Sequence, residues 1–572
     1  MAVSESPAIT VKEIDLTGVV PNVASTTGAF VGNFNWGPVR EPTLVSDEAG
    51  LVSVFGSPSK TNNIDFLSAA YYLKYSNTLY VTREVTTAAK NAYDSDAASA
   101  PLVRSVNNFA YQDDALDSDA HTFIAKWPGT LGNSLQVAFL DAVDSADDPA
   151  FTSWTYADNF DGAPQTSDYA TNIGSTKDEM HVVVIDQDGA FTGTRGTVLE
   201  TFPFVSVASD AKASDGTSNY ILDVINNRSR YIWMAGFGNQ SKFDSNAGEV
   251  CSNGKVFGSD LGAQTISLVG GVDSGALDEG DYETGFDTFE DVDKIQVDFL
   301  IAPGMLTKTA QTTVVNNLVS IAQQTRKDCV VVASPSRNAG LIVATTAEII
   351  SEAKTFTYSS YLFLDNNYLK VYDKYNDVYV NIPAASSTAG LMAASDNNTA
   401  AWYSPAGQRR GVYLGVTAVV QQPNKANRDL LYRNGINPIA NIPGQGILLY
   451  GDKTHMARPS AFDRINVRRL FLVIERAIAI AARNVLFEFN DEFTRAEFVN
   501  IVEPFLREIQ GRRGITDFRV VADETNNTPA VIDRNEFICS IFIKPARSIN
   551  FVTLNFVAVR TGVDFEEVVG TV

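Results

Sequence analysis

The side chains of this sequence that could do chemistry are mostly carboxylates. Nine acidic residues lie between positions 273 and 293, and Asp186-Gln-Asp-Gly189 resembles a fragment of a calcium-binding loop. An EF-hand loop needs oxygen ligands at fixed spacing, a central glycine and a distal Glu. Neither segment has that order. We therefore expect a solvated acidic loop at 273–293, a turn at 186–189, and no metal or other cofactor.

The histidines give no support to a hydrolase. His121, His181 and His455 all lie outside residues 206–400, so that segment cannot supply a Ser-His-Asp constellation by itself. The sequence also lacks the Walker A, G-x-G-x-x-G, H-E-x-x-H and G-x-S-x-G motifs, which frame phosphate sites, zinc sites and serine nucleophiles. Adjacent carboxylates such as Asp491-Glu492 could serve a glycosidase, but charge at a helix N-terminus explains them without a cleft. We expect no enzymatic activity.

The charge distribution argues against nucleic acid as a partner. The 572 residues carry 67 acidic and 44 basic side chains, a net charge of -23, and such a surface repels phosphate while it keeps an abundant protein soluble. Residues 401–572 differ, with 21 basic residues, 18 of them Arg, against 18 acidic ones. No run reaches the ~18 apolar residues of a membrane span, so direct membrane insertion is not expected.

Short β-prone runs dominate the first third of the chain. The runs Leu135–Leu140 and His181–Ile185 are rich in β-branched residues, and a turn sequence follows the second. This pattern predicts antiparallel hairpins within residues 95–205. Residues 1–24 contain only one β-prone stretch, Ile9–Ile14, and are interpreted as an extended arm.

A different pattern begins after residue 206. Val297–Ile301 is a buried-strand run, residues 307–326 carry apolar side chains at helical spacing, and Cys329–Ala333 is a second buried-strand run. Strand, helix and strand at this spacing form a βαβ unit. The sequence therefore predicts an α/β domain with a mostly parallel sheet.

The C-terminal part is predicted to be mixed. Its longest helix begins near Asp463, and Thr494-Arg-Ala-Glu497 matches a capping box at the start of the next helix. Predicted strands follow at residues 517–522, 536–544 and 549–560. The last of these alternates apolar and polar residues.

Several segments, in order along nearly the whole chain, resemble the contractile tail sheath proteins of myophages and related injection systems. The downstream ones are Ala401-Trp-Tyr-Ser-Pro-Ala-Gly407, Leu431-Tyr-Arg-Asn-Gly-Ile-Asn437, Pro443-Gly-Gln-Gly-Ile-Leu-Leu-Tyr-Gly451-Asp-Lys-Thr454, Ile465-Asn-Val-Arg-Arg469 and Phe487-Glu-Phe-Asn490. The upstream ones are Trp127-Pro-Gly-Thr-Leu-Gly-Asn-Ser134, Phe191-Thr-Gly-Thr-Arg-Gly196 and Asn219-Tyr-Ile-Leu-Asp-Val-Ile-Asn226.

The resemblance implies a layered subunit. Its parts would be an N-terminal arm (1–24), a first part of the middle domain (25–94), an outer β-rich insertion (95–205), a subtilisin-like α/β middle domain without a triad (206–400), an inner α/β domain (401–548) and a C-terminal arm strand (549–572). The expected fold class is thus multidomain α/β and β with extended β arms at both ends.

The resemblance also implies a function and partners. The expected function is that of a structural subunit that polymerises helically around a tail tube, in rings of six, and shortens to drive the tube through the host envelope. Expected partners are copies of itself, the tube protein, and the baseplate and tail terminator proteins. It would act in the virion after assembly in the host cytoplasm. The open alternatives are a surface-layer or tail-tube subunit and a cytosolic glycosidase.

Two sets of residues are candidates for the site. The first would add strands to neighbouring subunits and comprises Ile9, Val11, Ile14, Val552, Leu554 and Phe556. The second would face acidic groups on the tube and comprises Arg464, Arg468 and Arg469, because Arg pairs with carboxylates through a planar fork. The alternative for these three is pairing within one subunit, with Glu475, Glu488 and their neighbours.

Overall fold

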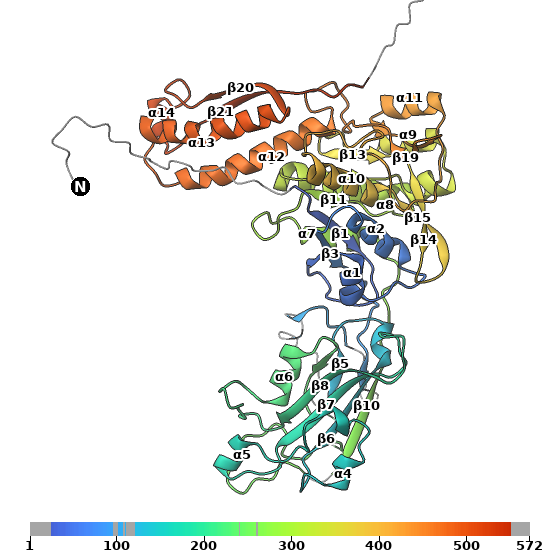
Figure 1. The fold of residues 1–572 in the computed structure, drawn as a ribbon, viewed down its shortest axis with the longest axis vertical. Coiled ribbons are helices and arrows are strands. Elements are labelled where there is room, and N and C mark those ends of the chain that lie inside the picture. The colour runs from blue at the N-terminus through green and yellow to red at the C-terminus, as the bar shows by residue number, and fades with distance from the viewer. Residues whose placement is uncertain are drawn as a thin grey trace, which may run out of the picture. The chain divides into compact units, whose positions relative to one another are not determined.

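The computed structural model describes residues 25–94, 101–106, 109, 121–238, 241–258 and 261–550. These residues form two compact units, which divide between Ala477 and Ile478. Both are mixtures of helices and strands, as Figure 1 shows. The arm segments 1–24 and 551–572, which hold all six candidate arm residues, lie outside the described residues.

A parallel sheet forms the centre of the larger unit. Its strand order is β17-β13-β12-β11-β1-β3-β2, and only β2 at one edge is antiparallel. The strands are β1 Gly28–Gly32, β2 Thr43–Val45, β3 Leu79–Arg83, β11 Phe299–Ile301, β12 Val330–Ala333, β13 Leu362–Asp365 and β17 Ile436–Asn437. The predicted βαβ unit is confirmed, because β11 and β12 pair in parallel and α8 (Lys308–Ser320) joins them.

Helices cover both faces of this sheet, because its inner strands are apolar on both sides. Phe299 and Ile301 pack on one face with α2 (Asn63–Leu73) and α10 (Ala385–Asn398). Leu300, between them, packs on the other face with α7 (Glu279–Asp287) and α8. Figure 1 shows these helices around the sheet. This alternation follows directly from the two-residue period of a strand.

The larger unit also contains an antiparallel sheet, ordered β8-β7-β6-β10-β4-β5-β9. Its strands are β4 Tyr93–Asp94, β5 Phe123–Ala125, β6 Leu135–Asp141, β7 Glu179–Asp186, β8 Thr197–Ser206, β9 Ile232–Met234 and β10 Ala263–Val269. The predicted hairpin strands are confirmed as β6 and β7. The expected end of the insertion at residue 205 differs from the structure, because β9 and β10 complete this sheet. Short helices accompany it: α4 Pro149–Thr152, α5 Asp168–Ile173 and α6 Ile221–Arg228.

The rest of the larger unit consists of smaller elements. They are α1 Glu48–Phe55, α9 Thr346–Ala353, α11 Lys425–Arg433, the sheet of β14 Tyr368–Asp373, β15 Val378–Pro383 and β16 Ala418–Val419, and the hairpin of β18 Ile439–Ile442 and β19 Gly446–Leu449. The expected boundary at residue 400 also differs from the structure. β17 is an edge strand of the parallel sheet, so residues 401–477 belong to the same compact unit as that sheet.

The smaller unit is built on the long helix α13 (Glu492–Gly511) and a hairpin of β20 (Ile515–Val521) and β21 (Ser540–Pro545), with the short helix α14 (Pro529–Ile532). Phe498, Val502, Leu506 and Ile509 form the buried stripe of α13. The predicted capping box at Thr494 is wrong. The N-cap is Asp491, whose carboxylate accepts the backbone N–H of Thr494 at 2.8 Å, so the helix begins one turn earlier.

The chain's arginine-bearing helix is α12, Ile465–Ala482, which begins where the sequence predicts. The expectation that it is the longest helix of the C-terminal part is wrong, because it has 18 residues and α13 has 20. Its first turns are almost entirely buried, including Ile465, Val467 and Leu470. An amphipathic surface helix would leave one side of these turns in water. The start of α12 is therefore enclosed on all sides, which decides where its arginines can reach.

Candidate functional site

The buried histidines are structural. His181 accepts the backbone N–H of Phe204 at Nδ1 (3.1 Å), and its Nε2 lies 2.8 Å from the carbonyl of Gly162, while its ring stacks on Phe160. Burial lowers the pKa of His181 and lowers that of His455 to about 4. Both rings are neutral at physiological pH and enclosed, so neither is placed to act as a base on a substrate.

The carboxyl ends of the parallel strands, where α/β enzymes bind ligands, are sealed here. Asp365 is the last residue of β13 and accepts from the hydroxyl of Ser334, which follows β12, at 3.0 Å. It also accepts from the backbone N–H of Asn367. Burial raises the pKa of Asp365 to about 7. Because Asp365 and Ser334 are both buried, this pair stabilises the fold and has no access to a substrate.

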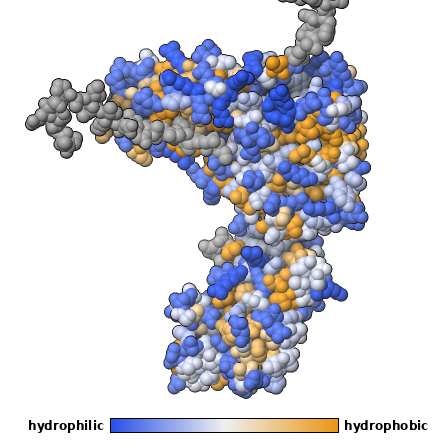
Figure 2. Space-filling model, viewed as in Figure 1, coloured by the Kyte–Doolittle hydropathy of each residue, from blue (hydrophilic) through white to orange (hydrophobic). Residues whose placement is uncertain are grey.

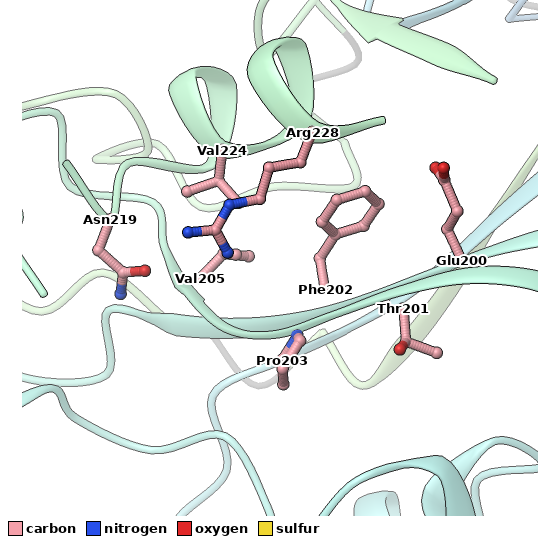
Figure 3. Close-up of a pocket in the computed structure, with 8 residues that line it drawn as sticks. All are labelled: Glu200, Thr201, Phe202, Pro203, Val205, Asn219, Val224 and Arg228. Carbon is pink, nitrogen blue, oxygen red and sulfur yellow. The ribbon is translucent and has the colours of Figure 1, made fainter. Parts of the chain in front are cut away.

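A cavity of about 300 Å³ lies between β8 and α6 (Figure 3). Phe202, Val205 and Val224 make it largely apolar, and the Arg228 side chain extends across it from α6. The Glu200 carboxylate at its other end is already bound to the Ser229 hydroxyl (2.7 Å) and the Arg230 backbone N–H (2.9 Å). This lining offers no acid and base pair for catalysis.

Within the described residues, no group of three or more His, Cys, Asp or Glu side chains is arranged to hold a metal ion. Nor does any helix in that part of the chain combine the length and the apolar character needed to cross a membrane. On the face seen in Figure 2, apolar residues form several separate patches between hydrophilic ones.

The hairpin β20–β21 is a sheet with open edges. Among the described residues each strand pairs only with the other, in a register that runs from Ile515 opposite Pro545 to Val521 opposite Ser540. Two-stranded sheets are marginal alone, and α13 supports this one on one face. The outer edge of each strand carries backbone donors and acceptors that a further strand can pair with.

The arginines proposed to face a tube do not project from the subunit. Arg468 and Arg469 are 7% and 3% exposed. Arg468 donates to the Ser360 hydroxyl at 2.6 Å, and its guanidinium lies over the rings of Tyr361 and Phe462, 4.3 and 4.0 Å from their centres. We therefore correct the expectation for these two. Their long side chains and planar cations pack on aromatic faces inside the chain.

Arg469 is bound within the chain as well. It donates to the carbonyl of Met392 at 2.9 Å and lies 3.5 Å from the Asp396 carboxylate. Burial lowers the pKa of Arg468 and of Arg469. The alternative of pairing within one subunit thus describes these residues better, although Arg469 uses Asp396 and carbonyl groups instead of the glutamates that we considered.

Arg464 is the most accessible of the three, but it too has partners. Its guanidinium binds Asp452 at 2.9 Å and the hydroxyl of Tyr432. Sequence reasoning gave no role to Arg476, which proves to be a main anchor of α12. Arg476 binds the buried Asp298 carboxylate, the carbonyl of Asp328 at 2.8 Å and the carbonyl of Val297 at 3.2 Å. Arg476 lies seven residues after Arg469, about two helical turns, so both side chains lie on the same side of α12. That spacing was the available indication in the sequence.

Comparison with known proteins shows where this arrangement belongs. The phage tail sheath protein central domain matches residues 275–455, and the phage tail sheath C-terminal domain matches residues 457–558. The tail sheath proteins of Enterobacteria phage T4 and Vibrio phage KVP40 are 32% and 31% identical, over 99% of this chain and 99% of each relative. The chain belongs to the phage tail sheath family. It is a structural subunit of a contractile tail sheath, a component of the virion.

Solved structures share the fold at low identity. The sheath tail protein from Listeria innocua has a TM-score of 0.55 with 13% identity, covering 93% of this chain and 97% of its own. The contracted helical sheath of the anti-feeding prophage has a TM-score of 0.51 with 13% identity, covering 97% and 99%. Family membership over the full length supports a structural role and favours the sheath subunit over the surface-layer, tail-tube and glycosidase alternatives.

Proposed function

We propose that this subunit polymerises into a helical sheath of six-membered rings around a tail tube, and that its terminal arms link the subunits. The observation that supports this is the open β20–β21 hairpin in a family of sheath subunits. Residues 9–14 and 549–560 are β-prone and lie near the two ends of the sequence. An arm from a neighbour would extend the hairpin by strand addition at either edge.

Strand addition suits a sheath that shortens. Each net hydrogen bond contributes about 1 kcal/mol, and several bonds in each arm make a link that persists while domain faces exchange partners. The two packings of the subunit would then differ in free energy, which is released on triggering and needs no cofactor. Shortening would drive the tube through the host envelope.

The remaining family features are proposed on the same basis. The α/β unit is a subtilisin-like middle domain without a triad, the antiparallel sheet is the outer insertion, and the smaller unit belongs to the inner domain. Of the candidate arginines, only Arg464 retains an accessible guanidinium for an acidic tube surface. Baseplate and terminator proteins would bind the ends of the polymer, and assembly would take place in the host cytoplasm.

Removal of residues 549–572 tests the arm role. The truncated chain should remain folded by circular dichroism, because the arm is proposed to pair with a neighbouring subunit and not with its own core, and it should fail to polymerise in sedimentation. A matched control carries the same segment with Val552, Leu554 and Phe556 replaced by Thr, which keeps strand propensity while removing apolar contacts. If the truncated chain forms sheaths like the full-length chain, the proposal fails.

A further inference from the structure

The loop between α12 and α13, together with the first residues of α13, exposes an unusual number of large apolar side chains. Leu486, Phe487, Phe489 and Phe493 lie within eight residues, and the last two are 84% and 76% exposed. We call residues 486–493 the phenylalanine loop. A single exposed apolar residue needs no explanation, but a contiguous group of this kind marks an interaction site.

The loop is held in a fixed shape. The Asn490 amide donates to the carbonyl of Glu536 at 2.8 Å, and the Arg495 guanidinium donates to the Asn490 amide oxygen at 2.9 Å. Asp491 caps α13 immediately afterwards. Phe487 has a φ of +72°, a conformation that is strained for a bulky residue. The polar side chains of the loop thus hold its backbone in place, while its phenyl groups are exposed and do not pack in the core of the unit.

The same unit carries a second exposed surface, on the β20–β21 sheet. In the strand register Arg519 lies opposite Phe542 and Asp517 opposite Lys544, and these four side chains point to one face. All four are exposed, Phe542 by 61%. The less exposed pairs, such as Phe518 opposite Ile543, point to the other face. We call the face with Phe542 the exposed sheet face.

The two surfaces are complementary in character. The phenyl groups of the loop alternate with the acidic side chains of Glu488, Asp491 and Glu492. The exposed sheet face combines the Phe542 ring with the Lys544–Asp517 ion pair (3.0 Å) and with Arg519, which forms no ion pair among the described residues and is therefore the cation left for a partner. An open helical polymer is built from heterologous contacts, in which two different surfaces of one chain meet between copies.

We propose that the phenylalanine loop of one subunit docks on the exposed sheet face of a second copy. Phe489 would pack beside Phe542, and Glu488 would pair with Arg519. This inference rests on the proposed helical assembly and adds a contact to it. Strand addition uses the backbone edges of the hairpin, whereas this contact uses side chains on its face, so that both can form on one hairpin.

Photo-crosslinking of the assembled full-length chain tests the contact. Benzoylphenylalanine at position 489 should crosslink to residues 515–545 of another copy, which a mixture of isotope-labelled and unlabelled chains distinguishes from crosslinking within one chain. The matched control places the same group at Val250, an exposed apolar residue of the antiparallel-sheet part. Crosslinks confined to one chain, or directed to another part of the neighbour, overturn the inference.

Two sets of substitutions give a readout in solution. Phe489→Ser should raise the critical concentration for polymerisation at least about tenfold while circular dichroism stays unchanged, because the side chain makes no core contact. Glu488→Arg and Arg519→Glu should each raise it by up to about fivefold, and the double variant should restore it. Polymerisation of Phe489→Ser at the wild-type concentration overturns the inference and leaves the proposed assembly intact. Failure of the wild-type chain to polymerise overturns both.

Discussion

The anchor of α12 at Arg476 allows a quantitative prediction. Arg476→Ala removes the cation from an ion pair whose side chains are 9% and 7% exposed, and it leaves the Asp298 carboxylate without its hydrogen-bonded counter-charge, with Arg469 as a further positive charge nearby. Breaking one side of a buried pair costs about 3–5 kcal/mol. Two carbonyl groups, those of Val297 and Asp328, lose a donor at the same time. Because Arg476 lies in the larger unit, Asn22–Ala477, whose unfolding entropy is about 1 kcal/mol/K by size, we expect the melting temperature to fall by roughly 3–5 °C.

The pH dependence of this loss has a definite sign. Burial raises the pKa of the Asp298 carboxyl, and Arg476 acts in the opposite direction. Without Arg476 the folded-state pKa rises further above the unfolded value, so ionised Asp298 destabilises the variant at neutral pH. As the pH falls through that raised pKa the carboxyl is protonated and the electrostatic part of the loss disappears. Packing and hydrogen-bond losses remain.

The assay is thermal unfolding by circular dichroism at one scan rate, at about pH 7.5 and about pH 5. The control is Arg433→Ala, at the exposed C-terminal end of α11, which should change the melting temperature little. Asp298→Asn in the Arg476→Ala background should recover part of the loss at the higher pH, because it removes the uncompensated charge. An Arg476→Ala melting temperature equal to that of the control at both pH values would refute the reasoning.

Three further predictions concern stability. Asp365→Asn should reduce the pH dependence of the free energy of unfolding. In the wild type, Asp365 has a folded pKa of about 7, above its unfolded value, so the free energy of unfolding falls by up to about 1.4 kcal/mol per pH unit as the pH rises toward 7. A variant with the same slope in urea titrations would contradict this. Leu318→Ala, in the buried stripe of α8, should cost about 2–5 kcal/mol in urea unfolding, and a loss no greater than that of the exposed Thr313→Ala would contradict the packing. Asp491→Ala should lower the melting temperature more than Thr494→Ala, because Asp491 caps α13. The reverse order would contradict this and support a capping box that begins at Thr494.

The sequence predicts the parallel sheet well, because the strands and the helix of the βαβ unit carry apolar residues at the spacing typical of each element. These apolar residues are buried in the fold. The end of the antiparallel insertion is harder to predict. β9 is three residues long and follows α6, so strand and helix signals alternate as they do in α/β segments. Its membership in the antiparallel sheet depends on pairing with β5, more than a hundred residues earlier in the chain.

The arginines show that a charged side chain in the sequence does not always lie at the protein surface. Arg is rarely buried, so a helix bearing Arg468 and Arg469 is expected to expose them. Tyr361, more than a hundred residues before Arg468, supplies an aromatic face that no local pattern reveals. The capping error has a similar origin. Thr494 and Asp491 both suit an N-cap, and which one caps depends on where the preceding loop allows the helix to begin.

A helical reconstruction of the purified, assembled chain by cryo-electron microscopy tests the central claim most directly. We expect tubes with six subunits per ring, in which the β20–β21 hairpin is extended at its edges by strands that belong to neighbouring chains. A reconstruction in which the hairpin edges carry no strand from another chain, or a preparation that forms only flat lattices or closed particles, would contradict it.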